Sequence, residues 1–179
     1  MILNKVYSVV SIVVLAFSIS ACNSNATKST SAPALEMYEV FEDGRVYVFY
    51  DRALYKEFMT VKETPYRLTK IGAGPNGMTV VFGLTKKDKK LKRKIPAIEL
   101  YEGKTTNNGQ FYAEMRRHGR IYVFDKWSDM KPVRETGHPN YFYTEIGSGP
   151  KGETVIYVLN KKTKKKRPLS LIKKFKNKV

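Results

Sequence analysis

Two glutamates, Glu39 and Glu114, are the residues whose type and spacing best suit acid–base chemistry, since they occupy the same position in two similar stretches of sequence. A pair of carboxylates can act as general acid and general base if the fold brings them face to face. The alternative is a structural role, in which each glutamate forms a cross-strand ion pair with the arginine that follows it, Arg45 or Arg120. We predict the ion pairs, because residues of one hairpin meet without any long-range arrangement.

Metal and redox chemistry have few candidate ligands in this chain. It contains one cysteine, Cys22, and two histidines, His118 and His138. A single cysteine excludes an intramolecular disulfide and a multi-cysteine zinc or iron–sulfur site. Neither histidine has a nucleophile or an acid close to it in sequence. We therefore predict a non-enzymatic protein without a metal or other cofactor.

Basic residues are unevenly distributed along the chain. The sequence has 33 Lys+Arg against 16 Asp+Glu, a net charge of +17, and residues 86–94 and 160–179 contribute +16 of it. These segments are either solvated turn tips or an anion-binding surface, and their equivalent positions could place them side by side. The candidate anion-binding residues are Lys86, Lys87, Lys89, Lys90, Lys92, Arg93, Lys94, Lys161, Lys162, Lys164, Lys165, Lys166, Arg167, Lys173 and Lys174.

The N-terminus has the pattern of an export signal. Lys5 precedes an apolar run over residues 6–17, which is shorter than the roughly 20 residues that span a bilayer, so we predict a signal peptide over residues 1–21. The segment Ile19-Ser20-Ala21-Cys22 resembles the lipobox of bacterial lipoproteins. The resemblance implies that Cys22 receives a diacylglycerol and becomes the new N-terminus. In a Gram-negative host, Asn23 at the next position implies sorting to the outer membrane.

The polar residues that follow Cys22 predict a flexible tether. Residues 22–35 comprise the predicted lipidated cysteine and a segment rich in Ser, Thr, Asn and Ala. Residues 23–34, fully extended, reach at most roughly 40 Å.

The remainder of the chain contains one module twice. Residues 37–90 match residues 112–165 at 21 of 54 positions without a gap, which indicates a tandem duplication. We predict a first module at residues 36–102, a linker at 103–110 and a second module at 111–179. Because a module of this size buries little surface by itself, we expect the two to pack about a pseudo-two-fold axis, through one continuous sheet.

Each module is predicted to be of the α+β class, with the order ββ(α)ββ, a mostly antiparallel sheet and a final apolar element. In the first copy, strands are expected at residues 38–41, 45–50, 66–71 and 78–84, and a helix at 51–62 behind a capping Asp51. The second copy contains Pro132 and fewer apolar residues there, so we predict a shorter helix or none. In the C-terminal segment, Leu169, Ile172 and Phe175 recur at helical spacing among lysines, as in a helix that lies on a membrane surface.

Two further patterns resemble ligand sites. The segments IGAGPNG at 71–77 and IGSGPKG at 146–152 are glycine-rich, but a strand follows each, whereas a phosphate-binding loop precedes a helix. We predict turns whose glycines adopt positive φ. The strand GR(V/I)YVF and the helix after it resemble the YHS-type metal-associated module, which handles metal through cysteines. The corresponding positions here are Tyr50, Asp51 and Tyr55, so metal chemistry does not carry over.

Together these patterns predict a membrane-anchored lipoprotein of the cell envelope. Its partners would be the membrane, through the N-terminal lipid, and an anionic lipid, lipopolysaccharide, acidic polysaccharide or partner protein, through the basic segments. One alternative is an extracytoplasmic enzyme or accessory subunit that acts on acidic glycans through a tyrosine-lined sheet. Another is binding of extracellular DNA. Nucleic acid is the weaker interpretation, because neither an RNA-binding aromatic signature nor a DNA-reading helix is visible.

Overall fold

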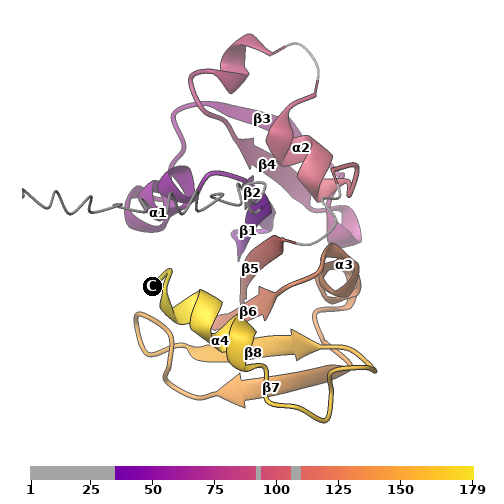
Figure 1. The fold of residues 1–179 in the computed structure, drawn as a ribbon. Helices are drawn as coiled ribbons and strands as arrows, with labels where there is room; N and C mark the ends of the chain where they lie inside the picture. The colour runs from indigo at the N-terminus through magenta and orange to yellow at the C-terminus, as the bar shows by residue number, and fades with distance from the viewer. Residues whose placement is uncertain (1–34, 92–93, 106–109) are drawn as a thin grey trace, which may run out of the picture. The chain divides into compact units, whose positions relative to one another are not determined.

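The fold contains the same order of elements in its two halves, as the computed structural model shows for residues 35–91, 94–105 and 110–179 (Figure 1). The first half comprises β1 (Leu35–Glu42), β2 (Arg45–Phe49), α1 (Arg52–Val61), β3 (Arg67–Lys70), β4 (Thr79–Gly83) and α2 (Pro96–Tyr101). The second half comprises β5 (Phe111–Arg117), β6 (Arg120–Phe124), α3 (Trp127–Thr136), β7 (Tyr141–Glu145), β8 (Thr154–Leu159) and α4 (Leu169–Lys176). The final apolar element predicted for each module is therefore a helix, α2 or α4.

All eight strands belong to one sheet, in the order β3-β4-β2-β1-β5-β6-β8-β7. Four of the seven strand pairings are antiparallel, and three are parallel: β1 with β5, β2 with β4 and β6 with β8. The predicted α+β class and mostly antiparallel sheet are therefore confirmed. The halves meet where β1 and β5 pair, so the expected continuous sheet is also present.

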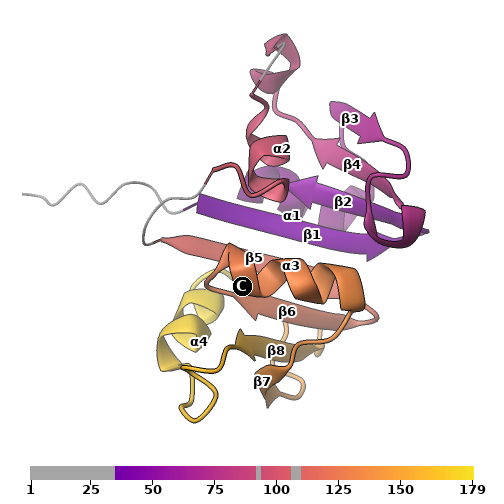
Figure 2. The ribbon, with the colours of Figure 1, turned by 90° about the vertical axis from the view of Figure 1, so that its right-hand side faces the viewer.

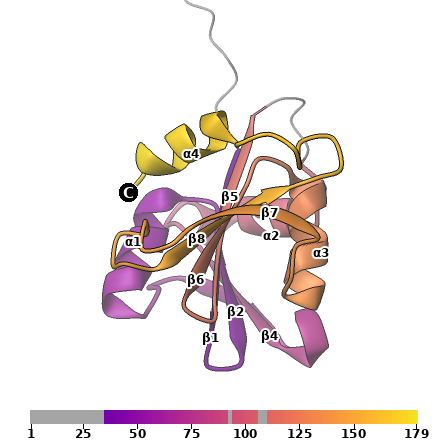
Figure 3. The ribbon, with the colours of Figure 1, turned by 90° about the horizontal axis from the view of Figure 1, so that it is seen from below.

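Corresponding helices of the two halves cover opposite faces of the sheet. Parallel strands can be related by a two-fold rotation only if the axis runs along the strands, and such a rotation exchanges the two faces of the sheet. Accordingly, α1 and α4 cover one face, and α2 and α3 cover the other (Figure 3). A residue of the first half and its counterpart in the second half therefore point to opposite sides of the sheet.

The predicted helix of the first half is confirmed, together with its cap. The side chain of Asp51 accepts a hydrogen bond from the backbone N–H of Leu54 at 3.0 Å, and the helix ends at Lys62, which adopts a left-handed conformation. Tyr55 and Phe58 lie buried on the inner face of the helix. Capping at the first turn and burial of one face explain why this polar-rich segment is helical.

The prediction of a shorter or absent helix in the second half is wrong. Helix α3 has 10 residues, as α1 does, and Pro132 lies inside it. Pro132 is exposed, whereas Met130 and Val133 are buried against the sheet. Burial of these side chains outweighs the hydrogen bond that proline cannot donate, so tertiary packing decides the outcome.

The two ends of the sheet differ in composition. At the proximal end, defined as the end at which Leu35 begins β1, strands β2, β4, β6 and β8 finish (Figure 2). The opposite end, here called the turn end, carries the four tight connections between antiparallel strands. The predicted glycine-rich turns lie at this end, and Gly72, Gly77, Gly147 and Gly152 all have positive φ, which confirms that prediction.

Candidate functional site

The first basic loop, residues 86–91 together with Lys94, is held in place by a buried aspartate. Asp88 is 4% exposed and its Oδ2 accepts hydrogen bonds from the N–H and hydroxyl of Thr85, at 2.8 and 2.7 Å, and from the hydroxyl of Tyr50 at 2.7 Å. The lysines on either side of Asp88 are exposed. The loop therefore presents its positive charges on an ordered turn.

The second basic loop, residues 161–167, is organised in a comparable way by Asn160. The Oδ1 atom of Asn160 accepts hydrogen bonds from the backbone N–H groups of Lys162 and Thr163, at 3.0 and 3.3 Å. Its amide nitrogen donates to Asp129 at 3.1 Å. An Asx turn thus takes the role that Asp88 has in the first basic loop.

One lysine of each basic loop lies over a tyrosine at the start of the adjacent edge strand, Tyr66 just before β3 and Tyr141 in β7. The Nζ atom of Lys89 is 4.9 Å from the centre of the Tyr66 ring, and that of Lys164 is 4.6 Å from the centre of the Tyr141 ring. The two pairs occupy equivalent positions in the halves. These contacts fix the direction in which each basic loop leaves the sheet.

The two basic loops lie at the same end of the sheet but not beside each other. They follow β4 and β8, which both finish at the proximal end and are separated by β2, β1, β5 and β6. Five strand spacings correspond to about 24 Å, and Figure 2 shows the segments that follow β4 and β8 at opposite edges of the sheet. The possibility of adjacent basic segments is therefore wrong. Lys92, Arg93 and the predicted lipidation site Cys22 lie outside the described residues.

Helix α4 does not offer a free apolar face to a membrane. Its residues Leu171, Ile172 and Phe175 are buried against the sheet, whereas Lys173 and Lys174 point away from it and are exposed. Of the three apolar residues that suggested a membrane-surface helix, Ile172 and Phe175 are covered by the protein's own core and Leu169 alone is exposed, so that interpretation is corrected. In the part of the chain that the structure describes, no helix has the length and apolar character needed to cross a membrane.

Glu39 and Glu114 do not face each other. In the register of β1 and β5, Glu114 pairs with Tyr38, so Glu39 points to the opposite face of the sheet. The predicted ion pairs with Arg45 and Arg120 are also wrong, because both arginines are exposed at the turn end while both glutamates are buried. The exchange of faces separates the two glutamates, and the hairpin registers place Glu39 opposite Val48 and Glu114 opposite Val123, away from the arginines.

Glu39 forms a buried ion pair with a residue of the second half. The Nε atom of Arg134 on α3 donates to Oε1 of Glu39 at 2.8 Å, and the side chains are 7% and 0% exposed. The guanidinium also lies 4.0 Å from the centre of the Tyr101 ring and donates to the Tyr101 carbonyl at 3.1 Å. This contact joins α2, β1 and α3 on one face of the sheet.

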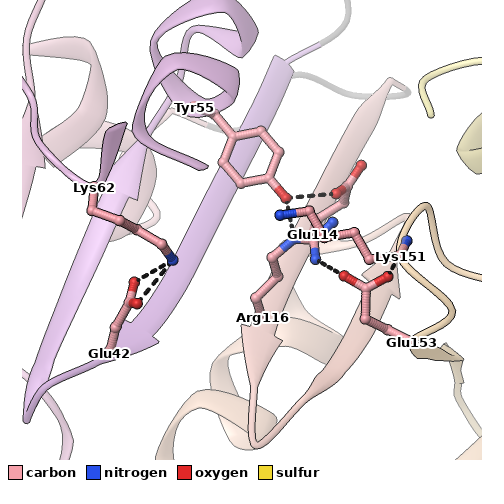
Figure 4. A network of polar contacts seen from close by, with 7 residues as sticks. All are labelled: Glu42, Tyr55, Lys62, Glu114, Arg116, Lys151 and Glu153. Carbon is pink, nitrogen blue, oxygen red and sulfur yellow. Dashed lines mark hydrogen bonds and ion pairs between the residues drawn. The ribbon is translucent and has the colours of Figure 1, made fainter. Parts of the chain in front are cut away.

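Glu114 instead lies at the floor of a cleft on the face covered by α1, where polar side chains form a network (Figure 4). Its carboxylate accepts hydrogen bonds from the hydroxyls of Tyr112 at 2.6 Å and Tyr55 at 3.2 Å. The Nε atom of Arg116 donates to the Tyr55 hydroxyl at 2.5 Å, and its Nη1 atom donates to Glu153 at 2.5 Å. A continuous chain of polar contacts thus connects α1, β5 and the start of β8.

The electrostatics of this cleft keep the phenols of Tyr55 and Tyr112 neutral and keep Arg116 and Glu153 charged. Burial and the Glu114 carboxylate raise the pKa of both Tyr55 and Tyr112 well above the usual range. Burial lowers the pKa of Arg116, but contact with Tyr55 and Glu153 outweighs it, so the pKa is raised. Burial raises the pKa of Glu153, yet hydrogen bonds from backbone N–H groups and from Arg116 hold it below its usual value. The tyrosines therefore act as hydrogen-bond donors near neutral pH.

Sequence reasoning identified Glu114 but missed the residues that surround it. Arg116 occupies the position of Phe41, and Met59 occupies that of Arg134, so the relevant signal is the departure from the repeat pattern. The positions that correspond to the metal-handling region of the YHS-type module have structural roles here. The hydroxyl of Tyr50 donates to Asp88, and Asp51 caps α1. Both histidines are exposed and lie outside the cleft, in the β5–β6 turn and after α3.

Comparison with known proteins finds no protein family, curated protein or solved structure that matches this chain.

Proposed function

We propose that this chain is a lipid-anchored protein of the bacterial envelope that contacts an anionic membrane through its two basic loops. The observation that carries the proposal is that both basic loops lie at the proximal end of the sheet, where the chain begins β1 at Leu35. The tether between Cys22 and β1 reaches at most roughly 40 Å. An anchor at Cys22 would therefore hold the proximal end near the bilayer.

The arrangement supplies the two signals that stable membrane attachment needs. One lipid group alone gives marginal binding, and a basic patch adds about 1 kcal/mol for each lysine or arginine near an anionic surface. Two separate basic loops would also orient the sheet, because attachment at two points about 24 Å apart resists tilting. We therefore propose a fixed orientation in which the turn end faces away from the membrane.

Vesicle binding tests the basic loops. The processed chain, residues 22–179 with Cys22→Ser, is sedimented with vesicles of phosphatidylglycerol and phosphatidylcholine, or with phosphatidylcholine alone. The double variant Lys87→Gln/Lys162→Gln should weaken binding to the anionic vesicles roughly 30-fold. The matched control Arg45→Gln/Arg120→Gln removes two equivalent charges at the turn end and should have a much smaller effect. Equal losses in the two variants, or equal binding to both vesicle types, would contradict the orientation.

Processing of the full chain tests the anchor separately. In bacterial cells that supply radiolabelled fatty acid, Cys22→Ser should abolish labelling and leave the precursor uncleaved. Membrane attachment with a retained label in this variant would contradict lipidation at Cys22. Parallel binding to lipopolysaccharide distinguishes the anionic ligands, and stronger retention there than on phosphatidylglycerol vesicles would reassign the partner.

A further inference from the structure

The cleft above Glu114 is a second charged site, separate from the basic loops. It has a volume of about 270 Å³ and lies between α1 and the β7–β8 turn. Side chains from both elements line it, with Arg52 and Lys56 on α1 and Lys151 in the turn. A cleft of this size suits one small chemical group or the head of a larger ligand.

The floor of the cleft is buried and carries two carboxylates, Glu114 and Glu153, and one guanidinium, Arg116. Glu114 is 4% exposed and Tyr55 is 5% exposed, and the Tyr55 ring stacks on that of Tyr38 at 4.4 Å. Arg116 links the Tyr55 hydroxyl to the carboxylate of Glu153. The guanidinium thus pairs with Glu153, whereas Glu114 accepts hydrogen bonds from two tyrosine hydroxyls.

Comparison with Glu39 explains why this space is open. On the opposite face of the sheet, Arg134 of α3 fills the equivalent region and pairs directly with Glu39. The residue of α1 that corresponds to Arg134 is Met59, whose side chain lines the cleft. Near Glu114, the positive charge comes from Arg116 on strand β5. The equivalent position on the helix is occupied by Met59, which is smaller and uncharged. The same scaffold position is therefore closed in one half and open in the other.

The rim of the cleft carries four positive side chains, of which Lys178 pairs with Glu36. Arg52, Lys56 and Lys151 form no ion pair with any residue that the structure describes. Lys56 and Lys151 are exposed and Arg52 is half-buried. These three cations outnumber the one carboxylate of the floor that has no cationic partner among the described residues, Glu114, so the opening attracts an anion.

We propose that this cleft binds a phosphoryl group, held between Arg52 and Lys56 on one side and Lys151 on the other. A phosphoryl group presents several acceptor oxygens, so it can bind cations from two elements at once, whereas a carboxylate has two acceptor atoms in one plane. The floor contributes shape and polarity. This site does not depend on the membrane orientation proposed above, because none of its residues belongs to the basic loops.

A titration with glycerol 3-phosphate, followed by phosphorus NMR at constant ionic strength, tests the site in the processed chain. The wild type should bind saturably, and Lys56→Gln/Lys151→Gln should weaken binding at least about tenfold. The control Lys87→Gln/Lys162→Gln also removes two lysines but should retain the affinity. Circular dichroism confirms that each variant is folded. Absence of saturable binding, or equal weakening by the control, would overturn the proposal.

A second variant separates a shaped site from general attraction to positive charge. Met59→Arg should occupy the cleft as Arg134 does on the other face, and so abolish binding although it adds a positive charge. Unchanged or stronger binding in this variant would overturn the proposal, because it would show that net charge alone is responsible.

Competition identifies the source of the phosphoryl group. Vesicles that contain phosphatidic acid should displace glycerol 3-phosphate if a lipid head can enter the cleft. If they do not, while the free ester binds, the ligand is a soluble phosphomonoester. Both results support the site, and failure of both probes to bind would overturn it.

Discussion

At the scale of single residues, Glu39 and Glu114 show how one sequence position can serve two structural roles. Glu39 depends on Arg134, because its Oε2 atom has no hydrogen-bond partner among the described residues. Glu114 depends on two tyrosine hydroxyls and, through one of them, on Arg116. The first arrangement closes the interface between helices, and the second leaves an accessible cleft. Removal of the positive partner should therefore have different consequences at the two sites.

Arg134→Met should destabilise the fold strongly, because it leaves Glu39 buried and unpaired. We expect a loss of about 3–5 kcal/mol in the free energy of unfolding, measured with urea. The double variant Glu39→Leu/Arg134→Met should recover most of this loss, since no charge then remains buried. Arg45→Met is the matched control and should change stability by less than about 0.5 kcal/mol, because Arg45 is exposed. A larger effect of Arg45→Met would restore the cross-strand ion pair inferred from sequence.

At the scale of elements, α3 shows that packing can maintain a helix against its own sequence. Gly137, which follows the helix, adopts the left-handed conformation, as Lys62 does after α1. The helix therefore ends at the position that corresponds to the end of α1, although Pro132 interrupts its hydrogen bonding. The inner face of α3 supplies the stabilisation that its outer face lacks.

Pro132→Ala should stabilise the protein by roughly 1–3 kcal/mol, because alanine restores the backbone donor at an exposed helical position. Met130→Ala, on the inner face of the same helix, should cost about 2–5 kcal/mol, because Met130 is fully buried. Urea unfolding of both variants provides the measurement. If Pro132→Ala lowers stability, then proline itself stabilises α3, which would contradict the conclusion that packing maintains the helix in spite of Pro132.

At the scale of the whole molecule, buried tyrosines make stability sensitive to alkaline pH. Burial raises the pKa of Tyr38, Tyr55 and Tyr112 above the usual range, and it raises the pKa of Tyr101 to about 12. In the unfolded chain these phenols ionise near 10.0. Their contribution to stability is therefore complete below pH 10.0 and is lost as the pH rises through the folded-state values.

We expect the urea concentration at the unfolding midpoint to fall as the pH is raised from about 9 to about 12, with tyrosinate absorbance developing together with unfolding. Tyr112→Phe should reduce this dependence on pH, because phenylalanine has no proton to lose. Development of the full tyrosinate absorbance near pH 10 in a protein that is still folded would show that the tyrosines are not protected.

Several features were decided by sequence alone, because they depend on local chemistry. Alternating apolar residues placed the strands, Asp51 marked the start of a helix, and glycines marked turns that require positive φ. The repeat pattern indicated that the two halves share an order of elements. The exposure of the two equivalent basic segments could also be predicted from the sequence, since a run of lysines must be exposed to water.

Tertiary structure decided which of these residues meet. Parallel pairing of β1 with β5 joins segments far apart in sequence and exchanges the faces of the sheet, so it separates Glu39 from Glu114. The same pairing sets the two basic loops near opposite edges of the sheet while keeping them at the proximal end. Local patterns specify the type of each element, but the register between distant strands specifies its neighbours. The cleft at Glu114 depends on these long-range neighbours, because Met59 leaves open the space that Arg134 fills on the opposite face.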